Sequence, residues 1–268
     1  MLMETYQKIS KLIEASDLEA ELCISEAAKV FQCSHNTVLA IYMQIVQKRL
    51  RKISHMNSDQ RIQSDHWKQF QSNNDSSKEA IHNLAKQLGL PPVMLAKMFI
   101  ELTELDKNQT STYILRNLEV IEDKILREQV QYCLDNDDQF GPSIDLIKKS
   151  IGEEYELILK DKLTLMNVPF KDENILRDQG YDKTPDLLLT VPIAIGDNVI
   201  NWIESKASFG DEHTHKQYLR EQYWSYSNRF GPGLVIYWFG FVDELAEQTL
   251  DKGIIIMDHM PSKITTLI

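Results

Sequence analysis

A β-hairpin in the C-terminal half of the chain is the sequence feature that most constrains its fold. Residues 187–191 and 199–205 are strand-like runs, and residues 195–198 between them carry an Ile-Gly-Asp-Asn turn sequence. Such runs on either side of a short glycine-containing turn are typical of two antiparallel strands. The register of this hairpin decides which polar side chains meet at its open end.

Two acids and a lysine lie at that open end. Asp186 comes directly before the first strand, and Glu204 and Lys206 come near the end of the second. Because side chains alternate along a strand, Glu204 and Lys206 point to the same face. A turn centred near Gly196 places Asp186 opposite residues 205–207. We therefore expect the three side chains to share one site.

This combination of side chains suits phosphodiester hydrolysis. The reaction needs a hard cation that neutralises developing charge and presents a nucleophilic water. Asp186 and Glu204 supply carboxylate ligands for Mg²⁺ or Mn²⁺, and Lys206 can hold the attacking water or stabilise charge on the phosphorus. The sequence therefore predicts a metal-dependent nuclease.

A third acid is expected from the preceding helix, which is predicted over residues 144–166. The candidates there are Glu153, Glu154 and Glu156. A helix that packs its apolar side chains inward leaves one glutamate facing the sheet edge, and we favour Glu156 as a catalytic residue and metal ligand. Glu153 and Glu154 are more typical of a solvated helix turn.

The order of the predicted elements gives the fold class of this half. A helix over residues 212–229 ends at a Gly-Pro-Gly sequence, and apolar runs at 234–239 and 253–257 read as buried strands. Helix, hairpin, helix, strand and strand in that order predict an α/β domain with a mixed sheet.

Helical periodicity dominates the first 105 residues, where two helix-turn-helix patterns occur. In the first, Ser25 is expected to cap a helix, and a second helix starts near His35 after a short turn. In the second, a helix over residues 80–88 breaks at Gly89 and another starts after Pro92. Two helices used only for packing or protein contact give the same pattern, so DNA binding is one of two interpretations.

Charge distribution bears on that choice. The net charge of -11 opposes binding to phosphate, but residues 27–70 are locally basic. The first helix-turn-helix pattern ends in four cations that we expect to bind nucleic acid, unless they simply form a solvated helix end. These cations are Lys48, Arg49, Arg51 and Lys52.

Other classes of protein are disfavoured by composition. The N-terminus lacks the pattern of a secretory signal, and the longest apolar run is too short for a membrane-spanning helix. Three cysteines without a C-x-x-C pair argue against a disulfide framework and a cysteine-rich zinc site. Residues 55–77 are polar and expected to form a linker or loose loop, and a helix is expected over residues 113–135. We expect an all-α domain over residues 1–110 and a nuclease-like α/β domain over residues 111–268.

The C-terminal motifs resemble known nucleases. Thr184-Pro185-Asp186 followed by Ile203-Glu204-Ser205-Lys206 resembles the pattern of the PD-(D/E)xK superfamily. Gly152-x-x-x-Glu156 resembles the first-helix glutamate of archaeal Holliday-junction resolvases, and Gln222-x-x-x-Tyr226 is similar to the Q-x-x-x-Y element of the RecB-like branch. More closely, residues 180–186, 202–212 and 228–238 look like the codanin-interacting nuclease family.

The resemblance implies a restriction-endonuclease-like fold after a helix-turn-helix region, and DNA as substrate, with branched and single-stranded forms both left open. It also implies codanin as a partner, a nuclear and cytoplasmic location, and a role in erythroid differentiation in animals. Gln222 and Tyr226 become expected substrate-binding residues, and Arg220 and Arg229 are expected phosphate contacts. Resolvase-like enzymes often dimerise, so a homodimer is a further alternative.

Four other interpretations stay open. Asp211, Glu212, His213 and His215 could bind zinc, although an acidic helix cap with exposed imidazoles is the favoured interpretation. The aromatic side chains of the helix over residues 212–229 could stack bases, although most are expected to pack against the sheet. The whole chain could instead be a catalytically weak nuclease-fold protein in a codanin and histone-chaperone assembly, or a helix-turn-helix regulator.

Overall fold

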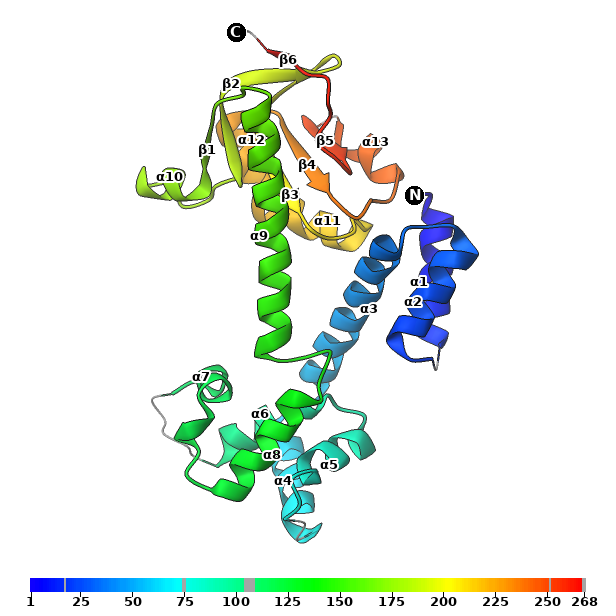
Figure 1. The fold of residues 1–268 in the computed structure, drawn as a ribbon, viewed down its shortest axis with the longest axis vertical. Helices are drawn as coiled ribbons and strands as arrows, with labels where there is room; N and C mark the ends of the chain where they lie inside the picture. Colours follow the sequence, from blue (N-terminus) through cyan, green and yellow to red (C-terminus); the bar gives the residue numbers. More distant parts are fainter. Residues whose placement is uncertain (17, 74–75, 104–108, 251, 267–268) are drawn as a thin grey trace. The chain divides into compact units, whose positions relative to one another are not determined.

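The computed structural model describes residues 1–16, 18–73, 76–103, 109–250 and 252–266 (Figure 1). Its internal contacts divide the chain into two compact units. The first combines Met1–Ile45 with Ile151–Ile268, and the second is Val46–Ser150. The sheet and the N-terminal helices up to residue 45 therefore belong to the first unit.

A six-stranded mixed sheet is the centre of the first unit. Its strands are β1 (Phe170–Asp172), β2 (Leu187–Ile195), β3 (Asn198–Lys206), β4 (Gly233–Tyr237), β5 (Ile254–Met257) and β6 (Thr265–Thr266). They run in the order β1-β2-β3-β4-β5, with β6 beside β2. The pairs β1–β2, β2–β3 and β2–β6 are antiparallel, whereas β3–β4 and β4–β5 are parallel. The predicted α/β domain with a mixed sheet is confirmed.

The predicted hairpin is formed by β2 and β3, and its register is irregular. Near the turn Ile195 pairs with Asn198, but at the open end Leu187 pairs with Ile203, because the register shifts between Leu188 and Ile193. Pro192 lies within that shift and has no N–H to donate to a ladder. The extra residues in β2 bring its start closer to Glu204 than a regular hairpin would.

Helices cover both faces of this sheet (Figure 1). On one face Leu159 and Leu163 of α9 (Pro142–Leu165) share a core with Ile203 and Leu234. The other face is covered by α11 (Glu212–Tyr218), a π-helical segment (Leu219–Tyr223) and α12 (Trp224–Phe230), whose Tyr223 and Tyr226 pack with Trp202 and Val235. The helices α10 (Glu173–Asp178) and α13 (Glu244–Leu250) complete this part of the unit.

The N-terminal helices share a core with the sheet. Buried side chains of α1 (Met3–Ala15), α2 (Ala20–Phe31) and the start of α3 (His35–Met56) belong to the same cluster as Trp202 and Tyr237. The ring of Tyr6 stacks on Phe209 with 5.5 Å between centroids, and Gln44 Nε2 donates to the Phe209 carbonyl over 2.6 Å. Contacts therefore join residues 1–45 to the C-terminal half, a different division from the expected one at residue 110.

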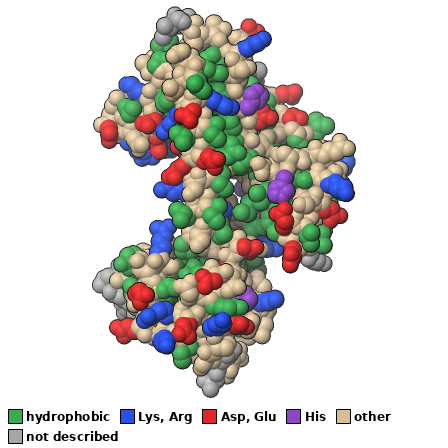
Figure 2. All heavy atoms as spheres, viewed as in Figure 1, with side chains coloured by type: hydrophobic (Ala, Val, Ile, Leu, Met, Phe, Trp, Pro, Cys, Tyr) green, Lys and Arg blue, Asp and Glu red, His purple; other side chains and the backbone are tan. Residues whose placement is uncertain are grey.

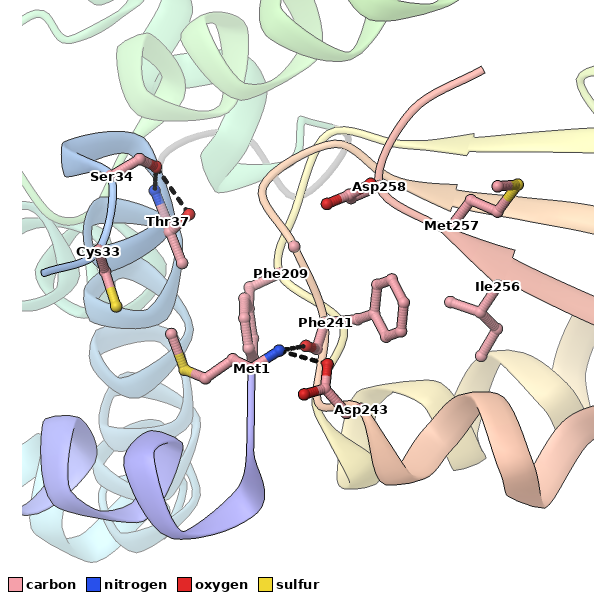
Figure 3. A pocket seen from close by; sticks show the side chains of 11 residues that line it. Met1, Cys33, Ser34, Thr37, Phe209, Phe241, Asp243, Ile256, Met257 and Asp258 are labelled. Atoms are coloured by element: carbon pink, nitrogen blue, oxygen red, sulfur yellow. Dashed lines mark hydrogen bonds and ion pairs between the residues drawn. The ribbon is translucent and has the colours of Figure 1, made fainter. Parts of the chain in front are cut away.

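A cavity of about 350 Å³ lies where these helices meet the sheet (Figure 3). The Met1 amine beside it donates to the Phe241 carbonyl over 2.9 Å and to Asp243 over 2.5 Å. The backbone N–H of Thr37 donates to Ser34 Oγ over 3.0 Å, so Ser34 caps the start of α3. The two bonds of the Met1 amine hold it against the segment between β4 and α13.

The first helix pair has the expected turn but not the expected start. Gln32 adopts a left-handed conformation with a φ of 52°, and α3 begins at His35 as predicted. The helix before it begins at Ala20, so Ser25 lies inside α2 and the prediction that it caps that helix is wrong. The helical propensity of residues 20–24 outweighs the capping preference of a single serine.

The second unit is helical. After the end of α3 it contains α4 (Gln60–Asn73), α5 (Ala80–Leu88), α6 (Pro92–Leu102), α7 (Ser111–Arg116), a 3₁₀ turn (Leu118–Val120) and α8 (Lys124–Asp135). The predicted break at Gly89 is confirmed, because that residue ends α5 with a φ of 67°. In the part of the chain with described coordinates, no helix is long and apolar enough to cross a membrane.

Two predictions in this unit are wrong. Residues 55–77 were expected to be a linker, but α4 occupies most of them, because Trp67 and Phe70 pack against Phe99 with ring centroids 5.0 Å away from it. The single helix expected over residues 113–135 is interrupted between α7 and α8, where Asp123 accepts hydrogen bonds from the first backbone N–H groups of α8.

Candidate active site

The start of β2 and the end of β3 bring Asp186 and Glu204 together. The backbone N–H of Asp186 donates to Glu204 Oε2 over 3.3 Å. In return, Asp186 Oδ2 accepts the backbone N–H of Ser205 over 2.7 Å. Two carboxylates are therefore placed by backbone hydrogen bonds, and the expected meeting of Asp186 with Glu204 is observed. The register shift places Asp186 opposite Glu204 rather than opposite residues 205–207 as predicted.

Lys206 completes this group on β3. Its Nζ atom donates to Glu204 Oε1 over 2.5 Å and to Gln222 Oε1 over 3.1 Å. The same ammonium lies 4.7 Å from the centre of the Tyr218 ring, within the range of a cation–π contact. Glu204 and Lys206 point to one face, as predicted, and Lys206 is held in one position by three neighbours.

Burial controls the electrostatics of these groups. Glu204 is 2% exposed. Loss of solvation raises the pKa of Asp186, although the Lys206 ammonium opposes that shift. Loss of solvation, followed by repulsion from Asp186, raises the pKa of Glu204. The folded chain thus holds two carboxylates close together with one ammonium beside them, an arrangement that attracts further positive charge.

The pKa of Lys206 is also raised, although burial acts on an ammonium in the opposite sense to a carboxyl. Burial on its own lowers the pKa of Lys206, but the charges of Glu204 and Asp186 and the hydrogen bond to Glu204 raise it above the ordinary value of 10.5. Lys206 is therefore a cation at neutral pH. It can attract or orient an anionic substrate group but does not release its proton readily.

Glu156 on α9 faces the same region. It is partly buried, and burial followed by repulsion from Asp186 raises its pKa, while Lys160 and Lys206 lower it. The charge of Asp186 reaches Glu156, whereas the structure records no hydrogen bond between the described atoms of these two residues. Glu156 is thus near the pair of carboxylates without forming part of their hydrogen-bonded arrangement.

The two bonded carboxylates fit a hard divalent cation. Their oxygens are the donor type that Mg²⁺ prefers, and Mg²⁺ is commonly held by one or two carboxylates with waters and substrate phosphates. No cluster of three or more His, Cys, Asp or Glu side chains suited to a metal occurs among the residues with described positions. The fit rests on Asp186 and Glu204, which would provide two carboxylate ligands once a bound cation displaces the protons that burial favours.

The helix above the site contributes Gln222 but buries Tyr226. Gln222 lies in the π-helical segment and accepts the bond from Lys206. Tyr226 is 4% exposed and packs edge-on against Trp202, with 5.4 Å between ring centroids. Burial, then the charges of Glu204 and Asp186, raise the pKa of the Tyr226 hydroxyl. Gln222 is hydrogen-bonded to Lys206, whereas no hydrogen bond between Tyr226 and a predicted catalytic side chain occurs among the described residues.

The two arginines expected to contact phosphate have different surroundings. Arg229 donates to Asp182 Oδ1 from both terminal nitrogens over 3.1 Å and to the Lys183 carbonyl over 3.2 Å. Its guanidinium also lies 5.6 Å from the Tyr181 ring centre. Arg220 is exposed and has a long contact of 3.4 Å with Glu221. Arg229 thus connects α12 to the loop that leads into Asp186.

The expected acidic cap of α11 is confirmed, but one of its imidazoles is buried. Asp211 Oδ1 accepts the backbone N–H groups of His213 and Thr214 over 2.9 Å and 3.1 Å. His213 is exposed, whereas His215 is buried and its Nδ1 lies 3.0 Å from the Tyr237 hydroxyl. The prediction of an exposed imidazole is therefore wrong for His215, because β4 carries a hydroxyl partner for it.

Two contacts of the site were not predicted from the sequence. Tyr218 lies over Lys206, and Lys183 Nζ donates to the Glu221 carbonyl over 2.8 Å. The spacing of Tyr218 and Gln222, four residues apart, is a signal that they share one helical face. No sequence signal indicates the partner of Lys183, because that partner is a main-chain carbonyl.

The four cations expected to bind nucleic acid lie on α3 in the second unit. Lys48, Arg49, Arg51 and Lys52 are all exposed. Arg49 donates to Gln139 Oε1 over 3.1 Å, which ties α3 to the residues before α9.

Comparison with known proteins identifies relatives of this chain. Residues 122–260 match the family described as "Protein of unknown function TPD sequence-motif". The chain is 38% identical to "CDAN1-interacting nuclease 1" of Danio rerio over 98% of this chain and 90% of that protein. It is 39% identical to the Homo sapiens protein of the same name over 87% of this chain and 86% of that protein.

The comparisons also find one more distant relative and no matching solved structure. The "Uncharacterized protein L539" of Acanthamoeba polyphaga mimivirus is 24% identical over 70% of this chain and 64% of that protein. No solved structure matches the chain. The TPD residues Thr184, Pro185 and Asp186 lead directly into the two-carboxylate site, and the high identity spans nearly the whole chain. The chain therefore belongs to the CDAN1-interacting nuclease 1 family.

Proposed function

We propose that this protein is a metal-dependent nuclease that hydrolyses phosphodiester bonds in DNA, with a restriction-endonuclease-like fold of the PD-(D/E)xK type. The observation that carries the proposal is the meeting of Asp186, Glu204 and Lys206 at the open end of one hairpin. Burying two carboxylates so close together costs stability unless positive charge compensates it. A site that binds a cation and an anionic substrate explains why the fold tolerates this cost.

Asp186 and Glu204 would hold Mg²⁺ or Mn²⁺, and Glu156 is the third acid on the side of α9. When bound, such an ion lowers the pKa of a bound water and neutralises charge on the phosphoryl oxygens. The backbone N–H of Ser205 orients one oxygen of Asp186. The protein therefore contributes ligands whose positions are set by the strands before any substrate arrives.

Lys206 is the residue that acts on the substrate. Its ammonium stays charged, so it stabilises the extra negative charge that develops on the scissile phosphate. Gln222 and the Tyr218 ring keep Nζ from rotating away, which limits the reorganisation needed in the transition state. The amide nitrogen of Gln222 stays available to contact the substrate, which is the role expected for this residue from the sequence.

A codanin-binding role is part of the proposal. The printed name of the relatives describes them as CDAN1-interacting, and the identity covers most of this chain. Because this protein belongs to the same family, we propose that it also binds codanin. We further propose a nuclear and cytoplasmic location and a link to erythroid differentiation. The alternative is a catalytically weak nuclease-fold partner of codanin, and the intact set of two acids and a lysine favours the enzyme.

Cleavage assays with defined substrates test the activity. Labelled single strands, duplexes, flaps and four-way junctions are incubated with Mg²⁺, Mn²⁺, Ca²⁺ or EDTA, using the wild type, Asp186→Asn and Lys206→Ala. Asp178→Asn is the matched control, because Asp178 is exposed on α10. We expect Mg²⁺- or Mn²⁺-dependent cleavage that both site variants lose and the control keeps. Binding without cleavage under every ion would instead support the non-catalytic alternative.

A further inference from the structure

A groove of about 480 Å³ lies within the second unit, and none of the residues that line it belongs to the candidate active site. One wall is a single face of α3, where Gln47, Arg51 and Ser54 recur at helical spacing, and Ser58 follows just after the end of that helix. The other wall contains Lys148 and the residues that precede and begin α9. The groove thus combines cations with neutral hydrogen-bonding side chains.

The cations of this groove lack partners. Among the described residues, neither Arg51 nor Lys148 forms a hydrogen bond or an ion pair, whereas neighbouring Arg49 is bonded to Gln139. Burial lowers the pKa of Lys148, and the charge of Arg51 lowers it further, although Asp145 opposes this. Two cations have thus been brought near each other with a single lining acid to offset them.

Two neighbouring cations lower the stability of the free protein and favour the binding of an anion. A partly buried ammonium beside a guanidinium is stabilised when a bound anion restores the lost solvation. The serine and glutamine side chains on α3 supply the uncharged donors that often contact phosphate oxygens and sugars. A phosphate group is therefore the ligand that matches the lining best.

The charge of the remaining surface offers little attraction for a nucleic acid. The chain carries a net charge of -11, and Figure 2 shows acidic and basic side chains interspersed on the face in view rather than a broad basic area. A nucleic acid approaching such a surface gains attraction only where cations are left unpaired. The groove at Arg51 and Lys148 is such a place.

We propose that the groove lined by Arg51, His55 and Lys148 binds a phosphate of the nucleic-acid backbone and so anchors substrate on the helical unit. The inference rests on the proposed nuclease function for the identity of the ligand. The proposed site differs from a general basic face, because binding is confined to one groove. This groove includes Lys148, which is more than ninety residues away in sequence from the basic cluster of α3. A backbone phosphate carries no base identity, so this contact by itself does not depend on the sequence of the nucleic acid.

Binding measured without cleavage tests the proposal. Fluorescence anisotropy of a labelled oligonucleotide is measured in EDTA for the wild type, for Arg51→Ala/Lys148→Ala, and for Lys68→Ala/Lys124→Ala. The last variant removes two exposed lysines of the same unit and is the charge-matched control. We expect the groove variant to lower affinity about tenfold and to reduce the slope of log affinity against log salt by roughly 1.4–1.8, and the control to do neither.

The possible results separate this inference from the proposed activity. Equal loss in the groove variant and its control would overturn the groove as a site. If the groove variant binds DNA as the wild type does but no longer binds a poly-glutamate peptide that the wild type binds, the groove takes an acidic protein segment instead. Cleavage by the wild type with an unchanged KM in the groove variant refutes the groove alone. Groove-dependent binding by a wild type that never cleaves refutes the nuclease alone.

Discussion

Asp186 and Glu204 are linked in both directions across the hairpin. The N–H of Asp186 donates to the Glu204 carboxylate, and the N–H that follows Glu204 donates to the Asp186 carboxylate. Neither side chain can be repositioned without breaking a main-chain bond on the opposite strand. The distance between the two acids is therefore a property of strand register, and small changes of register should affect activity strongly.

The stability of the metal-free protein should fall as the pH rises. Burial raises the pKa of Asp186 and Glu204 in the folded state, so both hold protons that the unfolded chain releases near its ordinary values of 3.8 and 4.5. The unfolded state then binds fewer protons, and the free energy of unfolding decreases from about those values up through the raised ones.

Urea unfolding in EDTA at several pH values measures this effect. The difference between the wild type and Glu204→Gln is the informative quantity, because the depressed pKa of His215, about 4, contributes equally to both. We expect the decrease with pH to be smaller in Glu204→Gln and unchanged in Asp178→Asn. If the free energy of unfolding changes with pH by the same amount in the wild type and in Glu204→Gln, the prediction is contradicted.

Divalent ions should reverse that loss of stability. An ion that binds only the folded state at one hundred times its dissociation constant adds about 2.7 kcal/mol to the free energy of unfolding. We expect Mg²⁺ and Mn²⁺ to raise the melting temperature more at pH 8 than at pH 5.5, because protonated carboxyls bind metal poorly. Differential scanning fluorimetry measures the shift, which Asp186→Asn should abolish.

Lys206 should matter for the chemical step more than for binding. Its ammonium is buried beside the carboxylates and held by Gln222, so removing it takes away charge stabilisation at one point. We expect Lys206→Met to lower kcat by about 10²–10³ with a smaller change in KM. Lys216→Met is the control, since Lys216 is exposed and pairs with Glu212 on the same helix. A kcat close to that of the wild type would remove Lys206 from the mechanism.

Arg229 should act through the loop before Asp186. Its bonds to Asp182 and to the Lys183 carbonyl hold that loop against α12. We expect Arg229→Ala to lower kcat with little change in KM, and Arg229→Lys to restore only part of it, because lysine cannot make the forked contact. If Arg229 instead contacts substrate phosphate, steady-state kinetics will show a raised KM with kcat preserved.

The sequence alone predicted the parts of the site that depend on local periodicity. Alternation placed Glu204 and Lys206 on one face, and the turn at Gly196 brought Asp186 close to them. The details depend on long-range packing. The register shift beside Pro192 and the π-helical segment that aims Gln222 both depart from regular periodicity, and the partner of His215 lies on β4, a separate element. For the same reason, the core shared by residues 1–45 and the sheet has no signature within either segment.

Gly233 should be intolerant of any side chain. A Cβ atom there would lie 2.0 Å from Trp202 Cε2, and Trp202 is fully buried with its indole N–H bonded to the Gly231 carbonyl. We expect Gly233→Ala to lower the free energy of unfolding by about 3 kcal/mol, at the upper end for overpacked cores. Chemical denaturation followed by tryptophan fluorescence measures the change.

Gly152 is the matched control for that substitution. It lies inside α9 and a Cβ atom there meets nothing within 4 Å. Since alanine favours a helix interior over glycine, Gly152→Ala should stabilise the protein by about 0.5–1 kcal/mol. Similar effects of the two substitutions would contradict the packing seen around Trp202.

The shared core of α1, α2 and the sheet has a consequence for how the chain matures. Residues 1–45 are synthesised before residues 202–237, so Ile9, Ile24 and Ile41 stay uncovered until Trp202 and Tyr237 are made. Contacts between such distant residues form slowly, because a long loop has to close first. A fragment beginning at residue 111 would expose the corresponding apolar surface permanently, and we expect it to aggregate rather than to yield an isolated nuclease half.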